Sequence, residues 1–335
     1  MFISEISNAI IKNDAVVLVR IIASSGSVPR TSGSSMIVYK DGSITGTIGG
    51  GAVEGDVIKT SLELFETKNA VIKSYDLNVS GSSNSLDIVC GGQMQVLTEY
   101  VSSEKSEIFK MADILVQEGK SVLMVTDFSD LNDVRYSIKT PDTDWTGQSF
   151  PAQHEDMILK KNDSLIYAGE SRYYVEQIKP RETIYLIGAG HVSKELAELC
   201  EKLDFRTVII DDREEFANKE RFPESGSVYV KEGFKGLFTD EKITANDYVV
   251  ILTRGHQYDR ESLEQALQTD AGYIGMIGSK KKRETVYAKM MSEGFTKDDL
   301  DRVHCPVGLP IGGDTPAEIS VSIAAQLIQH RSFQK

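Results

Sequence analysis

The chain has 335 residues, enough for about two domains of ~150 residues each. Lys and Arg number 37 and Asp and Glu number 50, so the net charge is −13, which argues against a nucleic-acid binder and against a protein held electrostatically on a membrane surface. Hydrophobic residues make up 40% of the chain and charged residues 26%, which is typical of globular proteins and too apolar for disorder.

Cysteine usage and the N-terminal segment lead us to expect a cytoplasmic protein. Cys90, Cys200 and Cys305 are widely separated and form no CxxC motif, which suits a reducing compartment. Residues 1–14 lack the basic beginning of a signal peptide. No apolar run reaches the ~18 residues that a membrane-spanning helix requires.

The first module, residues 1–178, is predicted to have an α+β fold. Asp41-Gly42 separates two short β-rich segments and predicts a hairpin with a type I′ turn. Residues 130–167 are polar and turn-rich and carry no clear pattern. The other expected elements are helix 2–13, strand 15–23, a helix after Gly49–Gly51, strand 70–77, strand 93–101, helix 107–120 and strand 121–128.

The second module, residues 183–335, alternates short apolar strands with helices, and Pro180 with its charged neighbours is the expected linker. This alternation predicts a Rossmann-like, doubly wound parallel sheet. No repeat at a fixed period occurs along the chain. Strands are expected over 183–190, 207–212, 227–230, 247–254, 273–279 and 303–308, with a charged helix after Asp212 and a last helix that starts at Asp314-Thr315.

Gly188-Ala189-Gly190 follows a strand and opens a helix, as a dinucleotide-binding turn does. Gly188 would permit the tight turn, and Gly190 would let the backbone approach a pyrophosphate. Ser193 stands where a third glycine is usual. Asp211, or its neighbour Asp212, ends the next strand, where an acid binds a ribose 2′-hydroxyl and favours an NAD-like over an NADP-like ligand. The alternative is a turn kept only for packing.

Gly49, Gly50 and Gly51 precede a helix and predict a cradle of backbone amides for an anion. The alternative is a flexible turn between strand and helix. Arg30, in a loop of Ser, Thr and Gly, suits bidentate binding of a phosphate or carboxylate. Its alternative is a solvated surface arginine.

Cys90 lies where a polar loop turns into a strand, directly before Gly91-Gly92. Two glycines would leave the thiol accessible to a large ligand, so we favour a functional thiol over a buried core cysteine. Cys200 is in line with Leu196 and Leu203 on a helix and is expected in the core.

Two further segments follow strands of the second module. Arg254, His256 and Asp259 come directly after the apolar run 248–252, and with His191 they would line the ligand crevice of a doubly wound sheet. Alternatively, Asp259 caps a helix. The run Lys280–Arg283 places four cations at a helix start, against the macrodipole, which an anionic ligand or partner would relieve. Its alternative is a solvated basic face.

Taken together, these segments resemble the XdhC/CoxI family. Three segments resemble the N-terminal module of that family: GSVPRTSGSSMIV, TGTIGGGAVE and CGGQMQVL. Five more resemble its C-terminal Rossmann module: IYLIGAGHV, VIIDDR, LTRGHQYD, YIGMIGSKKKR and PVGLPIGGDTPAEISVSIAAQLI. Ser193 and the stretch Gly312-Gly313-Asp314 depart from the family pattern. The middle of the chain carries no such resemblance.

The resemblance implies an accessory factor that binds the molybdenum cofactor (molybdopterin), supports its sulfuration, and hands it to apo xanthine dehydrogenase or a related molybdenum hydroxylase. It leaves open a cysteine desulfurase as a second partner, a homodimer, and NAD or another nucleotide as a ligand. A chaperone is favoured over a turnover enzyme, and no catalytic residue is assigned.

The implied cofactor site consists of Arg30, Gly49, Gly50, Gly51, Glu54 and Cys90, with Cys90 as metal ligand. The implied nucleotide site consists of Gly188, Gly190, His191, Asp211, Arg254 and His256. Two other functions are weighed against this one. An NAD-dependent oxidoreductase would need His256 as its acid–base residue, and a nucleotidyl transferase would need an acidic metal cluster that the sequence does not suggest.

Overall fold

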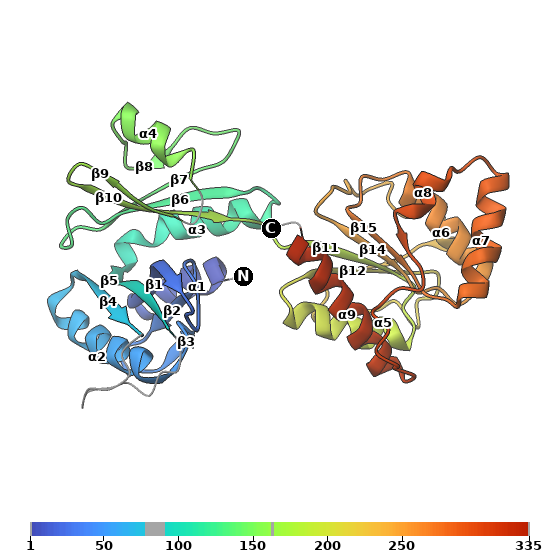
Figure 1. The fold of residues 1–335 in the computed structure, drawn as a ribbon, viewed down its shortest axis with the longest axis horizontal. Coiled ribbons are helices and arrows are strands. Elements are labelled where there is room, and N and C mark those ends of the chain that lie inside the picture. The colour runs from blue at the N-terminus through green and yellow to red at the C-terminus, as the bar shows by residue number, and fades with distance from the viewer. Residues whose placement is uncertain (1, 78–90, 162–163, 334–335) are drawn as a thin grey trace. The chain divides into compact units, whose positions relative to one another are not determined.

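The computed structural model describes residues 2–77, 91–161 and 164–333, and of His256 only the backbone. The chain divides into two compact units, Met1–Pro180 and Arg181–Lys335 (Figure 1). Among the described residues, no helix combines the length and the apolar character needed to cross a membrane.

The first unit begins with a five-stranded sheet, sheet A, whose strand order is β3-β2-β1-β5-β4 and whose neighbouring strands are all antiparallel. The expected helix at the N-terminus and the expected strands of this half are confirmed. The elements are α1 (Phe2–Asn13), β1 (Ala15–Gly26), β2 (Ser35–Val38), β3 (Ile44–Gly46), α2 (Gly51–Thr67), β4 (Ala70–Asp76) and β5 (Gly92–Ser102).

A second sheet, sheet B, has the order β8-β7-β6-β10-β9, which is the order of sheet A with every strand number raised by five. The helices fall at the same places between the strands, so the first unit contains two halves of one topology. The elements are η1 (Ser103–Lys105), α3 (Ser106–Gln117), β6 (Val122–Asp127), β7 (Arg135–Lys139), β8 (Thr146–Gly147), α4 (Ala152–Ile158), β9 (Ser164–Ala168) and β10 (Ser171–Ile178). The sequence showed no fixed-period repeat, and this repeat of topology was missed.

Strand register makes the equivalence of the two halves specific. In sheet A, Leu18 on β1 pairs with Ile37 on one side and Glu99 on the other. In sheet B, Met124 on β6 pairs with Ile138 and Glu176. Glu99 and Glu176 therefore occupy equivalent positions in the two sheets.

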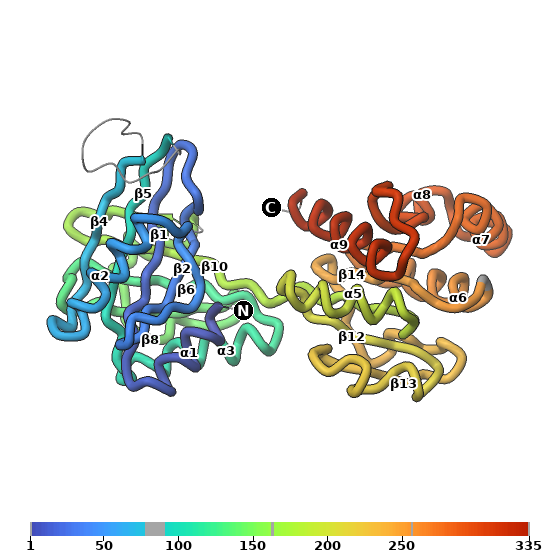
Figure 2. Tube along the Cα trace, turned by 90° about the horizontal axis from the view of Figure 1, so that it is seen from below, coloured from blue at the N-terminus to red at the C-terminus, as the bar shows by residue number. Residues whose placement is uncertain are grey.

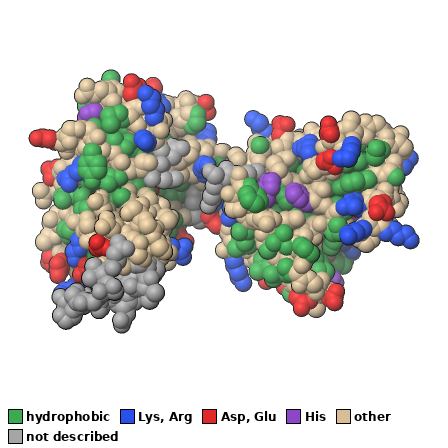
Figure 3. Space-filling view, viewed as in Figure 1, with side chains coloured by type: hydrophobic (Ala, Val, Ile, Leu, Met, Phe, Trp, Pro, Cys, Tyr) green, Lys and Arg blue, Asp and Glu red, His purple; other side chains and the backbone are tan. Residues whose placement is uncertain are grey.

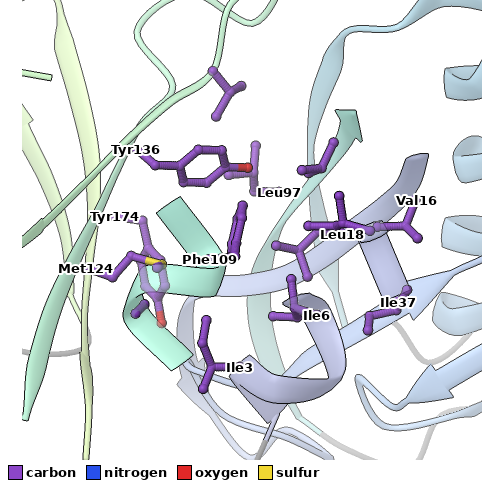
Figure 4. Close-up of a cluster of buried hydrophobic side chains, with 14 of the residues drawn as sticks. Ile3, Ile6, Val16, Leu18, Ile37, Leu97, Phe109, Met124, Tyr136 and Tyr174 are labelled. Atoms are coloured by element: carbon purple, nitrogen blue, oxygen red, sulfur yellow. The ribbon is translucent and has the colours of Figure 1, made fainter. Parts of the chain in front are cut away.

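Helices α1 and α3 pack against each other between the two sheets (Figure 1). Their apolar faces share one core with the inner faces of both sheets, including Ile6 of α1, Phe109 of α3, Leu18 of β1 and Met124 of β6 (Figure 4). Helix α2 packs on the outer face of sheet A, and α4 packs on the outer face of sheet B. The unit is thus a symmetric stack of layers, with the paired helices at its centre.

A buried ion-pair cluster lies between the two sheets. Arg20 of β1 is 1% exposed, and its guanidinium lies 2.5 Å from Glu99 Oε1 and 3.4 Å from Glu176 Oε1. The rings of Tyr136 and Tyr174 lie 5.9 and 5.7 Å from its guanidinium carbon. Burial alone would lower the pKa of Arg20, but the two carboxylates outweigh it and hold that pKa above the ordinary value, so Arg20 stays charged.

Replacing Arg20 by Met would leave Glu99 buried without its cation. Removal of one partner from a buried pair typically costs about 3–5 kcal/mol. The free energy of unfolding of the full chain, measured by urea titration, should fall by that amount, and the urea midpoint should fall with it. Lys120→Met is the control, since it removes an exposed pair with Glu118 that contributes at most ~1 kcal/mol. Equal destabilisation by the two substitutions would contradict this account of the core.

The predicted hairpin at Asp41-Gly42 is confirmed, but its turn type is wrong. Only Gly42 has a positive φ, 84°, whereas a type I′ turn needs positive φ at both central residues. The Tyr39 amide bonds the carbonyl of Ser43, and the Gly42 amide bonds the carbonyl of Tyr39. These bonds close a three-residue loop in which Gly42 takes the left-handed position, so Asp41 avoids a strained backbone.

The second unit is a doubly wound sheet, sheet C, of six parallel strands in the order β13-β12-β11-β14-β15-β16, which confirms the predicted fold. Helices α5 and α9 lie side by side on one face, and α6 and α7 cover the other (Figure 2). The elements are β11 (Thr183–Ile187), α5 (His191–Lys202), β12 (Arg206–Asp211), β13 (Ser227–Val230), η2 (Glu232–Phe234), β14 (Tyr248–Ile251), α6 (His256–Leu267), β15 (Tyr273–Met276), α7 (Lys280–Ser292), α8 (Lys297–Asp301), β16 (Val303–His304) and α9 (Pro316–Phe333). The charged helix expected after Asp212 is a series of turns instead.

Two histidines pack on a tyrosine beside the edge strand β16. The ring of His304 stacks on Tyr273 with centroids 4.6 Å apart, and the ring of His330 lies edge-on to Tyr273 at 5.2 Å. Desolvation lowers the pKa of both histidines, and the proximity of His330 adds to the lowering at His304.

Stability should therefore depend on pH through this pair. The folded state binds protons at His304 and His330 less readily than the unfolded state, so stability should fall as pH drops below the ordinary histidine value of 6.5 and level off below the folded pKa values. Melting temperatures from pH 8 to 5 should decline more steeply for the wild type than for His304→Gln/His330→Gln. Identical profiles would show that the pair does not couple to folding.

Candidate functional site

Two segments, the loop that follows β1 and the residues Gly91-Gly92 that open β5, meet at one end of sheet A. Gly26 pairs with Gly92, and the Ser27 amide donates to the carbonyl of Gly91 at 3.3 Å. A Cβ at Gly92 would lie 2.5 Å from the carbonyl oxygen of Ser25, so only glycine fits there. The loop that contains Arg30 therefore starts against the residues that directly follow Cys90. Cys90 itself lies outside the described residues.

A third segment, the loop Thr47–Gly50, joins this end of the sheet to α2. Gly49 has φ 124°, and a Cβ there would lie 2.8 Å from Cβ of Pro29 and 3.7 Å from Cγ of Arg30. The structure thus places Gly49 beside Arg30, two of the residues that the family resemblance assigns to one site. The side chain of Arg30 is exposed to solvent.

Glu54 accepts hydrogen bonds from the loop Thr47–Gly50. Its Oε2 accepts hydrogen bonds from the Thr47 hydroxyl at 2.6 Å and from the amides of Gly50 at 3.2 Å and Ile48 at 3.3 Å. Part of the amide cradle predicted for an anion is thus taken by a carboxylate of the chain itself. This carboxylate holds the strained turn in place at the start of α2.

The first turn of α2 remains open beside this cap. Gly50 is the N-cap residue with φ 76°, and no side chain caps the helix there. A Cβ at Gly50 or Gly51 would meet no atom within 4 Å. Since the first amides of a helix have no intrahelical acceptor, this open backbone is suited to an anionic group.

Two glycine substitutions in this region should have opposite effects. Gly49→Ala would force a side chain into a left-handed backbone and against Pro29, and we expect a loss of more than ~1 kcal/mol of unfolding free energy. Gly55→Ala, inside α2 and in open space, should gain about 0.5–1 kcal/mol. Urea titrations of both variants check this, and a neutral Gly49→Ala would remove the argument for a constrained turn.

The other two cysteines are poor candidates for a reactive thiol. Cys200 is buried in α5, as predicted, and desolvation raises its pKa to about 12. Burial raises the pKa of Cys305 to about 11. In the described part of the chain, no three His, Cys, Asp or Glu side chains gather in a metal-binding arrangement. The role of Cys90 as metal ligand stays a prediction.

In the second unit, the glycine turn lies at the point where the strand order reverses, between β11 and β14. Gly188 has φ 107°, and a Cβ there would lie 2.5 Å from the carbonyl oxygen of Leu252, so it must be glycine. Gly190 faces open space, and His191 is an exposed residue at the start of α5. Ser193 is buried and donates its hydroxyl to the carbonyl of Gly188, which explains a serine in place of the usual third glycine.

Asp211 ends β12 next to this turn. Its carboxylate accepts a hydrogen bond from the Ala189 amide at 2.7 Å and is 1% exposed. Burial opposes ionisation, but Arg213 and the Ala189 amide hold the pKa of Asp211 below its usual value. The neighbouring Asp212 forms an ion pair at 2.8 Å with Arg254, which follows β14.

Asp259 does not cap α6, because the N-cap residue is Gly255 and no side chain caps the helix. It is fully buried, accepts a hydrogen bond from Thr253 at 2.8 Å and forms an ion pair with Lys282. The side chain of His256 lies outside the described residues.

The basic run at the start of α7 is partly used inside the unit. Lys282 pairs with Asp259, and Arg283 donates to the carbonyl of Cys305, whereas Lys280 and Lys281 are exposed. On the face shown in Figure 3, basic side chains lie interspersed with acidic ones. Sequence reasoning missed these pairings and the role of Arg213, although an arginine directly after Asp211-Asp212 was a readable signal.

Both units match known families in the order expected. Residues 184–327 match the XdhC Rossmann domain, and residues 9–76 match the XdhC and CoxI family. The chain therefore belongs to the XdhC and CoxI family.

Relatives and a solved structure extend this likeness over the whole chain. The uncharacterized protein YqeB of Escherichia coli is 26% identical over 318 residues, 95% of this chain but 44% of YqeB, so the chain spans less than half of that relative. A Bacillus subtilis protein described as a probable subunit of xanthine dehydrogenase is 24% identical over 95% of this chain and 94% of its own. The crystal structure of a xanthine dehydrogenase from Bacillus halodurans is 26% identical, covers 99% of this chain and 96% of its own, and has a TM-score of 0.84.

Proposed function

We propose that the chain is an accessory factor of a xanthine dehydrogenase or a related molybdenum hydroxylase. In this role it binds the molybdenum cofactor in the first unit, supports its sulfuration, and passes it to the apo-enzyme in the cytoplasm. Family membership and the names of the Bacillus relatives support the link to xanthine dehydrogenase.

The observation that carries the cofactor assignment is the meeting of three glycine-containing segments at one end of sheet A: the loop after β1, the start of β5 at Gly91-Gly92, and the loop before α2. The open first turn of α2 at Gly50 and Gly51 suits the phosphate of the cofactor, and Arg30 beside Gly49 adds a guanidinium for the same group. Glu54 holds the turn. Thiolate sulfur matches a metal already bound by sulfur, so Cys90 is the proposed metal ligand.

The second unit is the proposed nucleotide site. Gly190 leaves room for a pyrophosphate at the start of α5, beside His191, and Arg254 and His256 follow the neighbouring strand β14. NAD or another nucleotide is the proposed ligand class. The proposed partners are the apo-enzyme and a cysteine desulfurase as sulfur source, and a homodimer is a further proposal.

Cys90→Ala should abolish cofactor handling without unfolding the protein. The full chain is incubated with molybdenum cofactor released from a molybdenum hydroxylase and passed over a gel-filtration column. The retained pterin is then measured by fluorescence after acid–iodine oxidation. We expect at least a tenfold loss of retained pterin and a change of less than ~1 kcal/mol in unfolding free energy.

Cys200→Ala is the matched control, because it removes a thiol from the core of the second unit. It should cost about 1–3 kcal/mol of stability and leave retention by the folded protein unchanged. Undiminished retention by Cys90→Ala would refute the metal-ligand role, and no retention by the wild type would refute the proposed function.

A further inference from the structure

The carboxylate of Asp211 is fully occupied by donors of its own unit. Oδ1 accepts the amide and Nε of Arg213 at 3.0 and 2.9 Å, and Oδ2 accepts the Ala189 amide at 2.7 Å and an Arg213 terminal nitrogen at 3.0 Å. A carboxylate has about four lone-pair sites, so these four bonds fill it. A ribose hydroxyl could bond to Asp211 only by displacing Arg213 or the Ala189 amide, so Asp211 as it stands in the structure does not indicate an NAD-like ligand.

The guanidinium of Arg213 is fixed in orientation by these contacts. Besides the two-pronged pair with Asp211, its guanidinium carbon lies 3.8 Å from the ring centroid of Phe216. Arg221 approaches the same ring at 5.0 Å and donates to the carbonyl of Ala189 at 3.3 Å. The Nε of Arg221 is buried and has no hydrogen-bond partner among the residues that the structure describes. Two guanidinium groups thus flank one aromatic ring at the end of β12.

Among the residues that the structure describes, the ion pairs at the end of β12 leave one guanidinium group without a carboxylate. Asp211 pairs with Arg213, and Asp212 pairs with Arg254 at 2.8 Å while lying 3.7 Å from Arg213. Arg221 has no carboxylate partner among the ion pairs of the described residues. Asp211 and Asp212 are paired with arginines, and Glu215 also acts on the charge of Arg213, so Arg221 is the guanidinium in this group that is left to meet a phosphate.

We propose that the crevice of the second unit binds a dinucleotide whose adenosine ribose carries a 2′-phosphate, with Arg213 and Arg221 as the phosphate ligands. The end of the second strand is where a doubly wound sheet meets the ribose 2′ position, and an arginine there accommodates a phosphate where an acid would accept a hydroxyl. The proposal rests on the nucleotide site proposed above and is independent of cofactor binding by the first unit.

The test compares ligands that differ only in this phosphate. Titration calorimetry of the full chain measures NADP⁺ against NAD⁺, and adenosine 2′,5′-bisphosphate against AMP. We expect the phosphorylated member of each pair to bind at least tenfold more tightly, and the advantage to shrink as salt is raised. Equal or tighter binding of NAD⁺ would overturn this proposal alone. Absence of binding by either dinucleotide would overturn it together with the nucleotide site, while pterin retention would still report on the first unit.

Variants assign the preference to residues. Arg221→Gln should weaken NADP⁺ binding about tenfold and leave NAD⁺ binding unchanged. Arg213→Gln, where it folds, should release Asp211 for ribose hydroxyls and invert the preference. Arg260→Gln is the control, because Arg260 pairs with Glu264 and Glu293 on α6 and α7, outside this cluster. An Arg221→Gln protein with the wild-type preference would overturn the assignment.

Discussion

A single buried guanidinium links the two sheets of the first unit. Arg20 lies between two sheets and pairs with Glu99 of one and Glu176 of the other, at equivalent positions in strand order and register. Burial of Arg20 and Glu99 is costly unless their charges are compensated, and the pairing of Arg20 with the partly exposed Glu176 links this buried pair to the second sheet. Helices α1 and α3 fill the remaining space with apolar side chains. The layered stack, and the loops at the end of sheet A, depend on that arrangement.

The sequence predicted the second unit better than the first because their strands carry different signals. The inner strands β11, β14 and β15 of sheet C are buried on both faces, and β14, Tyr248–Ile251, is a continuous apolar run that ends at a turn. In sheet B, β8 has two residues and α4 has seven, too few for either periodicity to show. The repeated topology left no repeat in sequence, since the corresponding loops differ in length and composition.

Candidate site positions could be predicted from the sequence where the backbone conformation allows only glycine. Gly49 and Gly188 have positive φ and no room for a Cβ, and such glycines stand out in a sequence. Which groups satisfy the surrounding donors and acceptors was not predictable, because it depends on side-chain placement in the folded chain. Glu54 takes amides expected for a ligand, and Arg213 takes a carboxylate expected for a ribose.

The duplicated topology of the first unit does not make its halves interchangeable as folding units. Thr126 on β6 pairs with Tyr174, in the position that Arg20 holds opposite Leu97 on β1. The first half therefore contributes both Arg20 and Glu99 to the cluster. The second half contributes Glu176, which pairs with Arg20 of the first half. Each half also buries apolar side chains against the other in one shared core, so separation would expose that core in both, and the two halves are coupled into one cooperative folding unit.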